Sequence, residues 1–245
     1  EIELPDCCEV VLYADDVAIL VAAKDGKSME HRGNLAIRRI LQTLNELGLS
    51  VENSKTKCLI ARGQRRSIPP NTCFSINGQR VDPSPQVKYL GVTLDADLNF
   101  VPHAKRISGL ATSALNALSA VLSAENVRMA RRRVIARVVE AKRLYASEVW
   151  WERMSVAGKE LLESVQKRAA VRIIRGLPST SGEAALVLAN MMPLDIQANA
   201  RRINLMKGFK PPPTEILKKW QARWNEKGPL WTRAIIPKLT TWTKR

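Results

Sequence analysis

Two adjacent aspartates between two aliphatic runs constrain the start of the chain more than any other feature. Residues 9–12 precede Tyr13, and Asp15 and Asp16 follow Tyr13 after one alanine. Residues 17–21 are again aliphatic and β-branched. Such runs favour strands, whereas neighbouring carboxylates repel each other and favour a turn. The pattern predicts a β-hairpin with two carboxylates at its tip. Hard divalent cations prefer carboxylate oxygens, so the tip is a candidate cation site, and a solvated acidic turn is the alternative.

The charge of the chain is unevenly distributed. The net charge is +16, yet residues 1–100 hold 12 Lys/Arg against 13 Asp/Glu, while residues 101–245 hold 27 against 10. This excess indicates a polyanionic partner for the second part. An acidic membrane surface would also fit the sign of the charge. No basic helix here has the broad aromatic, apolar face of an interfacial anchor, so we expect nucleic acid and no membrane.

Length and composition indicate a globular protein with one or two domains. The chain has 245 residues, 45% of them hydrophobic, and no apolar run approaches the length of a membrane span. Four cysteines lack C-x-x-C spacing, and the two histidines lie far apart in the sequence. We therefore expect reduced intracellular thiols and no zinc site. Because the first residue is Glu1 rather than Met, we expect a fragment of a longer chain.

Residues 22–95 alternate between helical and strand patterns. Apolar residues from 36 to 47 recur at helical spacing, with Ser28 as the expected N-cap and Gly48 as the stop signal. A strand is expected around residues 57–60. Asn77-Gly78 predicts a tight hairpin turn, and residues 87–94 predict a strand broken at Gly91. These elements indicate the α+β class.

From Pro102 onward the pattern is helical throughout. Apolar stripes cover residues 107–122, 134–139 and 161–173, and a further helix is expected over 194–206. Thr180 to Glu183 has the spacing of a capping box that opens a short helix to residue 190. Three prolines at 211–213 predict a break. Four tail tryptophans could stack on bases, but packing in the core is the favoured interpretation.

The second of these helices carries basic residues opposite its apolar stripe. Guanidinium groups bind phosphate with two parallel hydrogen bonds and provide affinity without reading sequence. This face is the candidate for nucleic-acid contact, with an ordinary solvated face as the alternative. Its residues are Arg131, Arg132, Arg133, Arg137, Lys142 and Arg143.

Three motifs in order resemble one enzyme family. Tyr13-Ala14-Asp15-Asp16 resembles the catalytic box of reverse transcriptases. Gly48-Leu49 followed by Lys55-Thr56 resembles the next box of non-LTR retrotransposon enzymes, and Lys88-Tyr89-Leu90-Gly91-Val92 resembles their primer-grip hairpin. Further segments are similar to the thumb and post-thumb region of type-1 elements that insert into ribosomal RNA genes: Ser147 to Trp150, Gln166 to Ala169, and Met192 to Leu194. The segment Trp220 to Trp224, with Trp231 and Ile236-Pro237, resembles the stretch just before the C-terminal Cys/His-rich domain of these elements.

The resemblance implies an RNA-directed DNA polymerase that joins nucleotides with two divalent ions, Mg²⁺ or Mn²⁺. Asp15 would be the principal ligand with Asp16 assisting, and a third carboxylate would come from an earlier strand that this chain lacks. Tyr13 would lie near the primer terminus and Lys55 near the triphosphate. Tyr89, Leu90 and Gly91 would form the primer grip. Where many relatives place Asn before Pro-x-Lys-Thr, this chain has Glu52-Asn53-Ser54, which leaves the conformation of that loop open.

The resemblance also implies how the chain is organised. Residues 1–95 would be the last part of the palm, 96–180 a helical thumb, and 181–245 an extension toward a missing C-terminal nucleic-acid-binding region. The partners would be an RNA template, a DNA primer or target and dNTPs. The parent polyprotein would also encode an endonuclease, and it would act in the nucleus at the site of integration. We expect the isolated chain not to polymerise.

Two alternatives remain from the residues themselves. The chain could be a basic helical module that binds RNA or DNA and carries a vestigial Asp pair. A palm-like nucleotidyl cyclase or template-free polymerase is a third interpretation. The Tyr-Leu-Gly segment and the helical second part argue against it.

Overall fold

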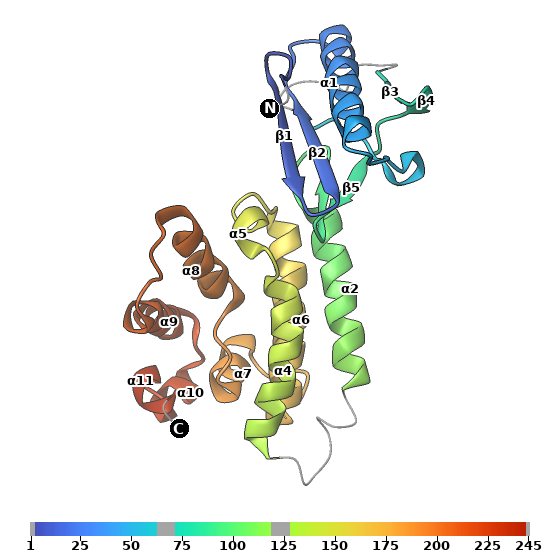
Figure 1. The fold of residues 1–245 in the computed structure, drawn as a ribbon. Helices are drawn as coiled ribbons and strands as arrows, with labels where there is room; N and C mark the ends of the chain where they lie inside the picture. The colour runs from blue at the N-terminus through green and yellow to red at the C-terminus, as the bar shows by residue number, and fades with distance from the viewer. Residues whose placement is uncertain (1–2, 63–71, 119–127, 244–245) are drawn as a thin grey trace. The chain divides into compact units, whose positions relative to one another are not determined.

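The chain forms two compact units, Glu1–Leu98 and Asn99–Arg245 (Figure 1). The structure is a computed structural model, and it describes residues 3–62, 72–118 and 128–243. The first unit combines small antiparallel sheets with helix, and the regular elements described in the second unit are all helices. The predicted α+β class is confirmed. The assignment of these units to a palm, a thumb and an extension stays a prediction.

The strands of the first unit form three separate two-stranded antiparallel sheets in the described part of the chain. An isolated two-stranded hairpin is marginally stable in water, so these sheets need another element to bury them. The pairs are β1 (Cys8–Tyr13) with β2 (Asp16–Val21), β3 (Phe74–Ile76) with β4 (Gln79–Val81), and β5 (Gln86–Tyr89) with β6 (Val92–Asp95).

Helix α1 (Gly26–Glu46) supplies the surface on which two of these hairpins pack. Its buried Ile37 contacts Phe74 and Ile76 of β3, and Ile19 of β2 packs against the same cluster. The side chain of Asn34 also accepts a 2.8 Å hydrogen bond from the backbone N–H of Ser75. One helix therefore holds both β1–β2 and β3–β4.

The ends of α1 are only partly as predicted. The N-cap is Asp25, not Ser28, because the Asp25 carboxylate accepts hydrogen bonds from the backbone N–H and the hydroxyl of Ser28 at 2.9 and 2.7 Å. A carboxylate at this position also interacts favourably with the helix dipole. Gly48 lies just past the end of the helix at a φ of +73°, a conformation that glycine adopts without strain, as predicted.

Two-residue turns close the other two hairpins. Asn77 and Gly78 have φ of +48° and +77°, so the predicted Asn-Gly turn is confirmed. The strand expected over residues 87–94 is broken at Gly91 as predicted, and the break is a chain reversal at Leu90 and Gly91, with φ of +43° and +81°, between two paired strands. The strand expected at residues 57–60 is wrong. Only an isolated bridge between Cys58 and Pro83 occurs there.

The helical periodicity of the second part is confirmed, although the boundaries differ by several residues. The apolar stripe predicted to continue to Leu122 extends beyond α2, and positions 119–122 lie outside the described residues. The helices are α2 (Val101–Ala117), α4 (Met129–Leu144), α5 (Ser147–Trp150), α6 (Val156–Ile174), α7 (Gly182–Ala189), α8 (Leu194–Lys207), α9 (Pro213–Lys227), α10 (Leu230–Ile235) and α11 (Leu239–Trp242).

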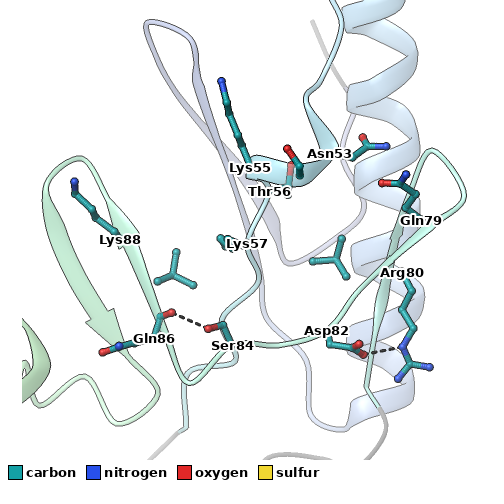
Figure 2. A pocket seen from close by; sticks show the side chains of 13 residues that line it. Asn53, Lys55, Thr56, Lys57, Gln79, Arg80, Asp82, Ser84, Gln86 and Lys88 are labelled. Carbon is teal, nitrogen blue, oxygen red and sulfur yellow. Dashed lines mark hydrogen bonds and ion pairs between the residues drawn. The ribbon is translucent and has the colours of Figure 1, made fainter.

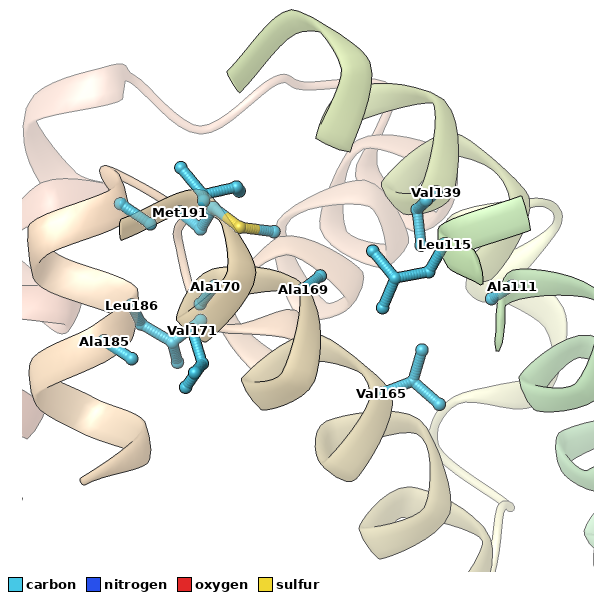
Figure 3. Close-up of a cluster of buried hydrophobic side chains, with 12 residues drawn as sticks. Ala111, Leu115, Val139, Val165, Ala169, Ala170, Val171, Ala185, Leu186 and Met191 are labelled. Carbon is cyan, nitrogen blue, oxygen red and sulfur yellow. The ribbon is translucent and has the colours of Figure 1, made fainter. Parts of the chain in front are cut away.

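Helix α6 lies at the centre of the main core of the second unit (Figure 3). Its Val165 and Ala169 pack with Leu115 of α2 and Val139 of α4, and its Ala170 and Val171 lie in the same cluster as α7 residues. Small alanines on α6 let neighbouring helices approach closely. The core of this unit is thus aliphatic and built around one helix.

A second cluster in the same unit is built on tryptophans. Trp220 and Trp224 are buried, and Trp224 Nε1 donates a 2.8 Å hydrogen bond to the carbonyl of Ile236. Trp242 donates similarly to the carbonyl of Val187 at 2.7 Å. These three tryptophans pack as predicted, whereas Trp231 is 81% exposed. Only Trp231 of the four therefore stays a candidate for base stacking.

Arginines from one helix cap the C-terminal carbonyls of another. Arg133 of α4 donates to the carbonyl of Ala189 at the end of α7 at 3.0 Å, and Arg172 of α6 donates to Leu115 near the end of α2 at 2.9 Å. Arg201 of α8 donates to Leu144 at the end of α4 at 2.8 Å. The last carbonyls of a helix have no partner within it and carry partial negative charge. These arginines therefore serve the packing of the helices.

The predicted capping box is wrong. Ser181 is the N-cap of α7 but forms no side-chain cap bond, and Glu183 turns to Arg223 of α9 instead, at 2.6 Å. Arg223 also pairs with Asp195 of α8 at 2.6 Å. This half-buried arginine links three helices, and that contact outcompetes the local capping geometry.

Glycine positions provide a paired test of the packing. A Cβ at Gly33 of α1 would lie 2.8 Å from Cδ1 of the buried Phe74 ring, whereas a Cβ at Gly109 of α2 would meet nothing within 4 Å. We expect Gly33→Ala to lower the free energy of unfolding by about 1–3 kcal/mol, despite better helix propensity. Gly109→Ala should raise it by up to ~1 kcal/mol. Urea denaturation followed by circular dichroism checks both, and stabilisation by Gly33→Ala would contradict the packing of α1 on β3.

A buried histidine makes stability depend on pH. His103 of α2 is fully buried edge-on to Trp150, with ring centroids 5.3 Å apart. Burial, and secondarily the charge of Arg106, lowers the pKa of His103 from 6.5 to about 4. Below about pH 6.5 the unfolded state binds the proton more readily, so stability should fall as the pH drops from about 6.5 toward 4. His103→Gln should flatten that part of the profile. An NMR titration of the imidazole in the intact chain that gave a pKa near 6.5 would contradict this.

Candidate functional site

The predicted hairpin tip is present in the structure. Tyr13 and Asp16 lie directly opposite each other at the end of the β1–β2 ladder, and Ala14 and Asp15 form the two-residue turn. Ala14 has a φ of +52°, which an alanine adopts only at a cost. Asp15 therefore lies in the turn, and Asp16 is the cross-strand partner of Tyr13. Two adjacent carboxylates and one aromatic side chain thus share the tip.

The carboxylates at this tip are available to a cation. Asp15 and Asp16 are exposed, and no described residue forms an ion pair with either. Tyr13 is 63% exposed. Mg²⁺ retains several waters and takes one or two carboxylates together with substrate phosphates, which fits this donor set. Within residues 3–62, 72–118 and 128–243, no group of three or more His, Cys, Asp or Glu could hold a metal ion. Among the described residues the tip therefore offers two exposed carboxylates, and a metal-binding role for them stays a prediction.

One face of the hairpin next to the tip is apolar and exposed. Side chains alternate across a strand, so the face that carries Tyr13 and Asp16 also carries Val11 and Leu20. Val11 is 44% and Leu20 53% exposed. Among the described residues β1 and β2 pair only with each other, so each has an unpaired outer edge. The hairpin could accept a further strand.

Lys55 lies at a second place in the first unit. It is the last residue of the 3₁₀ helix η1 (Asn53–Lys55), whose N-cap is Glu52. Hydrogen bonds from the side chain and backbone of Ser54 lower the pKa of Glu52. The substituted loop segment Glu52-Asn53-Ser54 is therefore ordered by its own side chains. Lys55 is exposed and lines a cavity of about 670 Å³, to which neither Asp15 nor Asp16 contributes (Figure 2).

The Tyr-Leu-Gly segment forms a hairpin turn, in agreement with the resemblance to a primer grip. Tyr89 ends β5, and Leu90 and Gly91 make the turn in left-handed backbone conformations. A left-handed leucine is costly, so the surrounding structure must hold it there. The Tyr89 hydroxyl is buried and no described residue hydrogen-bonds to it. The role of these three residues in nucleic-acid contact stays a prediction.

The basic residues of α4 do not form one exposed face. Arg131, Arg137 and Lys142 are exposed, but Arg132 and Arg143 are buried and Arg133 is half-buried. Arg143 is 0% exposed and donates to the carbonyl of Leu162 at 3.3 Å, and burial lowers its pKa to about 10. The predicted phosphate-contact surface is thus available at only three of its six residues.

Two functional candidates escape prediction from the sequence. Lys57 and Lys88 line the same cavity as Lys55, although they are separated along the chain by two strands and a segment outside the described residues. Lys88 belongs to the motif Lys88 to Val92, but the spacing of the motifs does not indicate that Lys88 shares a cavity with Lys55 and Lys57. Only the fold brings these lysines together.

Comparison with curated proteins finds relatives among type-1 retrotransposable elements. The chain is 25% identical to the Retrovirus-related Pol polyprotein of element R1 from Bradysia coprophila, over 94% of this chain and 26% of that protein. It is 27% identical to the Pol polyprotein of element R1 3 from Nasonia vitripennis, over 81% of this chain and 55% of that protein. No protein-family model and no solved structure matches.

The chain is a homologue of R1 retrotransposon Pol polyproteins. The resemblance noted in its motifs is thereby confirmed at the level of a non-LTR retrotransposon Pol-derived protein. This Pol-derived chain spans 26 to 58% of the length of three such relatives. None of its described helices combines the length and apolar character that a membrane crossing requires.

Helix α4 offers a test that separates surface charge from structural charge. We expect Arg137→Gln to weaken binding of duplex DNA and to reduce the slope of log K against log salt by about 0.9, because one phosphate contact is lost. Arg143→Met should leave that slope unchanged, and it should not lower the free energy of unfolding, because a buried charge is replaced by an apolar chain. Filter binding and urea denaturation measure these quantities. A change in slope for Arg143→Met alone would contradict the assignment.

Proposed function

We propose that this chain is part of the RNA-directed DNA polymerase of a non-LTR retrotransposon Pol polyprotein. The observation that carries the proposal is the β1–β2 tip, where Asp15 and Asp16 stand exposed beside Tyr13. The relation to R1 Pol polyproteins supports it. The substrates would be dNTPs, and the partners an RNA template and a DNA primer or target.

In this proposal Asp15 and Asp16 hold Mg²⁺ or Mn²⁺. Bound there, such ions would activate the primer 3′-hydroxyl and neutralise the leaving pyrophosphate. The turn places the two carboxylates on adjacent residues, so both would be within reach of one bound ion. Asp15 lies in the turn itself and would be the principal ligand, with Asp16 assisting.

The remaining residues would position the substrates. Tyr13, opposite Asp16, presents an exposed aromatic face to the primer terminus. Lys55 would neutralise the triphosphate, since its ammonium is exposed at the end of η1. The turn at Leu90 and Gly91 would bring backbone close to the primer strand, with Tyr89 supporting it.

The chain alone is proposed to be inactive. Two carboxylates hold only part of a two-ion site, and the third would come from an earlier strand of the parent polyprotein. The exposed Val11 and Leu20 face and the unpaired edges of the hairpin fit the addition of such a strand. In this reading residues 1–95 complete a palm, 96–180 form a thumb, and 181–245 lead toward a nucleic-acid-binding region.

The parent would act on chromosomal DNA in the nucleus. It would copy element RNA from a nicked primer, and an endonuclease elsewhere in the polyprotein would make the nick.

Metal binding by the intact 245-residue chain tests the first step. We expect Mn²⁺ to broaden the amide NMR signals of residues 14–17 selectively, because a paramagnetic ion relaxes nearby nuclei. The double variant Asp15→Asn/Asp16→Asn should lose this broadening. Asp25→Asn removes an exposed carboxylate elsewhere in the same unit and serves as the matched control. Equal broadening in the double variant would sink the metal role of the tip.

Primer extension tests the chemistry. In the longer Pol polyprotein, Asp15→Asn should lower template-dependent dNTP incorporation on the order of 10³-fold, while Asp25→Asn should not. The 245-residue chain should incorporate nothing. Incorporation by the short chain that depended on Asp15 would refute the inactive-fragment proposal.

The second candidate function is a basic nucleic-acid-binding module. The exposed Arg131, Arg137 and Lys142 of α4 favour it. In that case binding would be independent of Mg²⁺ and the Asp15→Asn variant would behave as the wild type in every assay.

A further inference from the structure

A cavity in the first unit gathers lysines from segments far apart in the sequence. Lys55 and Lys57 come from η1 and the residues after it, and Lys88 comes from β5. Figure 2 shows Lys55 and Lys88 extending in the same direction from two different walls. The three lysines belong to one concave surface of about 670 Å³.

The net charge of this cavity is positive. Asp82 is the only acidic residue among those that line it, and its carboxylate accepts a 2.7 Å hydrogen bond from Arg80. That ion pair cancels within itself, which leaves the charges of three lysines, of which Lys55 also interacts electrostatically with Glu52 just outside the lining. In the described part of the chain neither Lys57 nor Lys88 forms an ion pair. Three like charges in one concavity favour an anionic ligand.

The walls of the cavity are held in place before any ligand binds. Cys58 and Pro83 form a β-bridge, and the backbone N–H of Ser84 donates to the carbonyl of Cys58 at 2.8 Å. At the other end the Asn77 side chain donates to that of Asn53 at 3.1 Å. These bonds tie the η1 segment to the β3–β4 hairpin and to the chain that leads into β5. A preformed site loses little conformational entropy on binding.

We propose that this cavity is a phosphate-binding site that works without a divalent metal. Lysine ammonium groups bind phosphate as point charges, and three of them line this cavity. The volume falls within the range of ligand pockets and exceeds what a single phosphate fills. The ligand is therefore a group of linked phosphates, from a free polyphosphate or from the backbone of a nucleic-acid strand.

The metal independence follows from the lining. The only carboxylate among the lining residues, Asp82, is paired with Arg80, so the lysines rather than a bound Mg²⁺ would supply the positive charge that a phosphate needs. The site goes beyond the polymerase role proposed above, because it requires neither Asp15 nor Asp16. It adds Lys57 and Lys88 to the residues that contact phosphate.

The test uses the intact 245-residue chain in EDTA with two probes, inorganic tripolyphosphate and a short oligothymidylate. Amide NMR signals of residues 53–57 and 79–88 should shift with at least one probe. Shifts with tripolyphosphate identify a free polyphosphate ligand. Shifts with the oligonucleotide but not with tripolyphosphate identify a strand backbone.

Variants make the test specific. Lys57→Gln/Lys88→Gln should weaken binding at these signals about tenfold and reduce the salt slope for the oligonucleotide by about 1.4, or 0.7 per contact. Both side chains are exposed, so the fold should be unaffected. Lys27→Gln, an exposed lysine on α1 outside the cavity, is the matched control.

Two outcomes would overturn the proposal. One is that neither probe shifts the cavity signals until Mg²⁺ is added. The other is that Lys27→Gln weakens binding at these signals as much as the double variant, which would reduce the effect to net charge. Neither result depends on catalysis, so both are distinguishable from a failure of the polymerase assignment.

Discussion

The burial of one face of α1 is the contact on which the first unit depends. Two-stranded hairpins do not bury enough apolar surface to be stable alone, and here β1–β2 and β3–β4 share Ile37 and Phe74 as a common core. The close approach at Gly33 makes this possible, since any side chain there would displace the Phe74 ring. The carboxylate tip and the lysine cavity both extend from elements that this packing holds.

In the second unit some basic side chains stabilise the packing of helices, and others are exposed to solvent. Arg133, Arg172 and Arg201 satisfy helix-terminal carbonyls, and Arg223 joins three helices through two carboxylates. An excess of basic residues is therefore not a direct measure of a nucleic-acid footprint. A guanidinium is suited to both tasks because it carries five donors and is weakly hydrated.

Local signals in the sequence predicted the local structure well. The Asp pair between aliphatic runs, the Asn-Gly dipeptide and the helical stripes each determine their own element through short-range physics. Two of the wrong predictions concern side chains whose partners are distant in the sequence. Glu183 pairs with Arg223 instead of capping α7, and Arg143 is buried against the carbonyl of Leu162 instead of lying on an exposed basic face. The three-lysine cavity could not be predicted, because its walls meet through contacts between distant residues, such as the bridge between Cys58 and Pro83.

The length of the two-residue loop at the tip determines the register of the β1–β2 hairpin. Tyr13 and Asp16 face each other only because two residues separate them, and side chains on a strand alternate between faces. Adding or removing one residue in this loop would rotate Asp16 away from Tyr13 and move every following residue of β2 to the opposite face. Ile19 would then leave the α1 core for solvent. The length of this loop is thus fixed by the packing of the core. We expect substitutions at Ala14 to be tolerated far better than insertions or deletions in the loop.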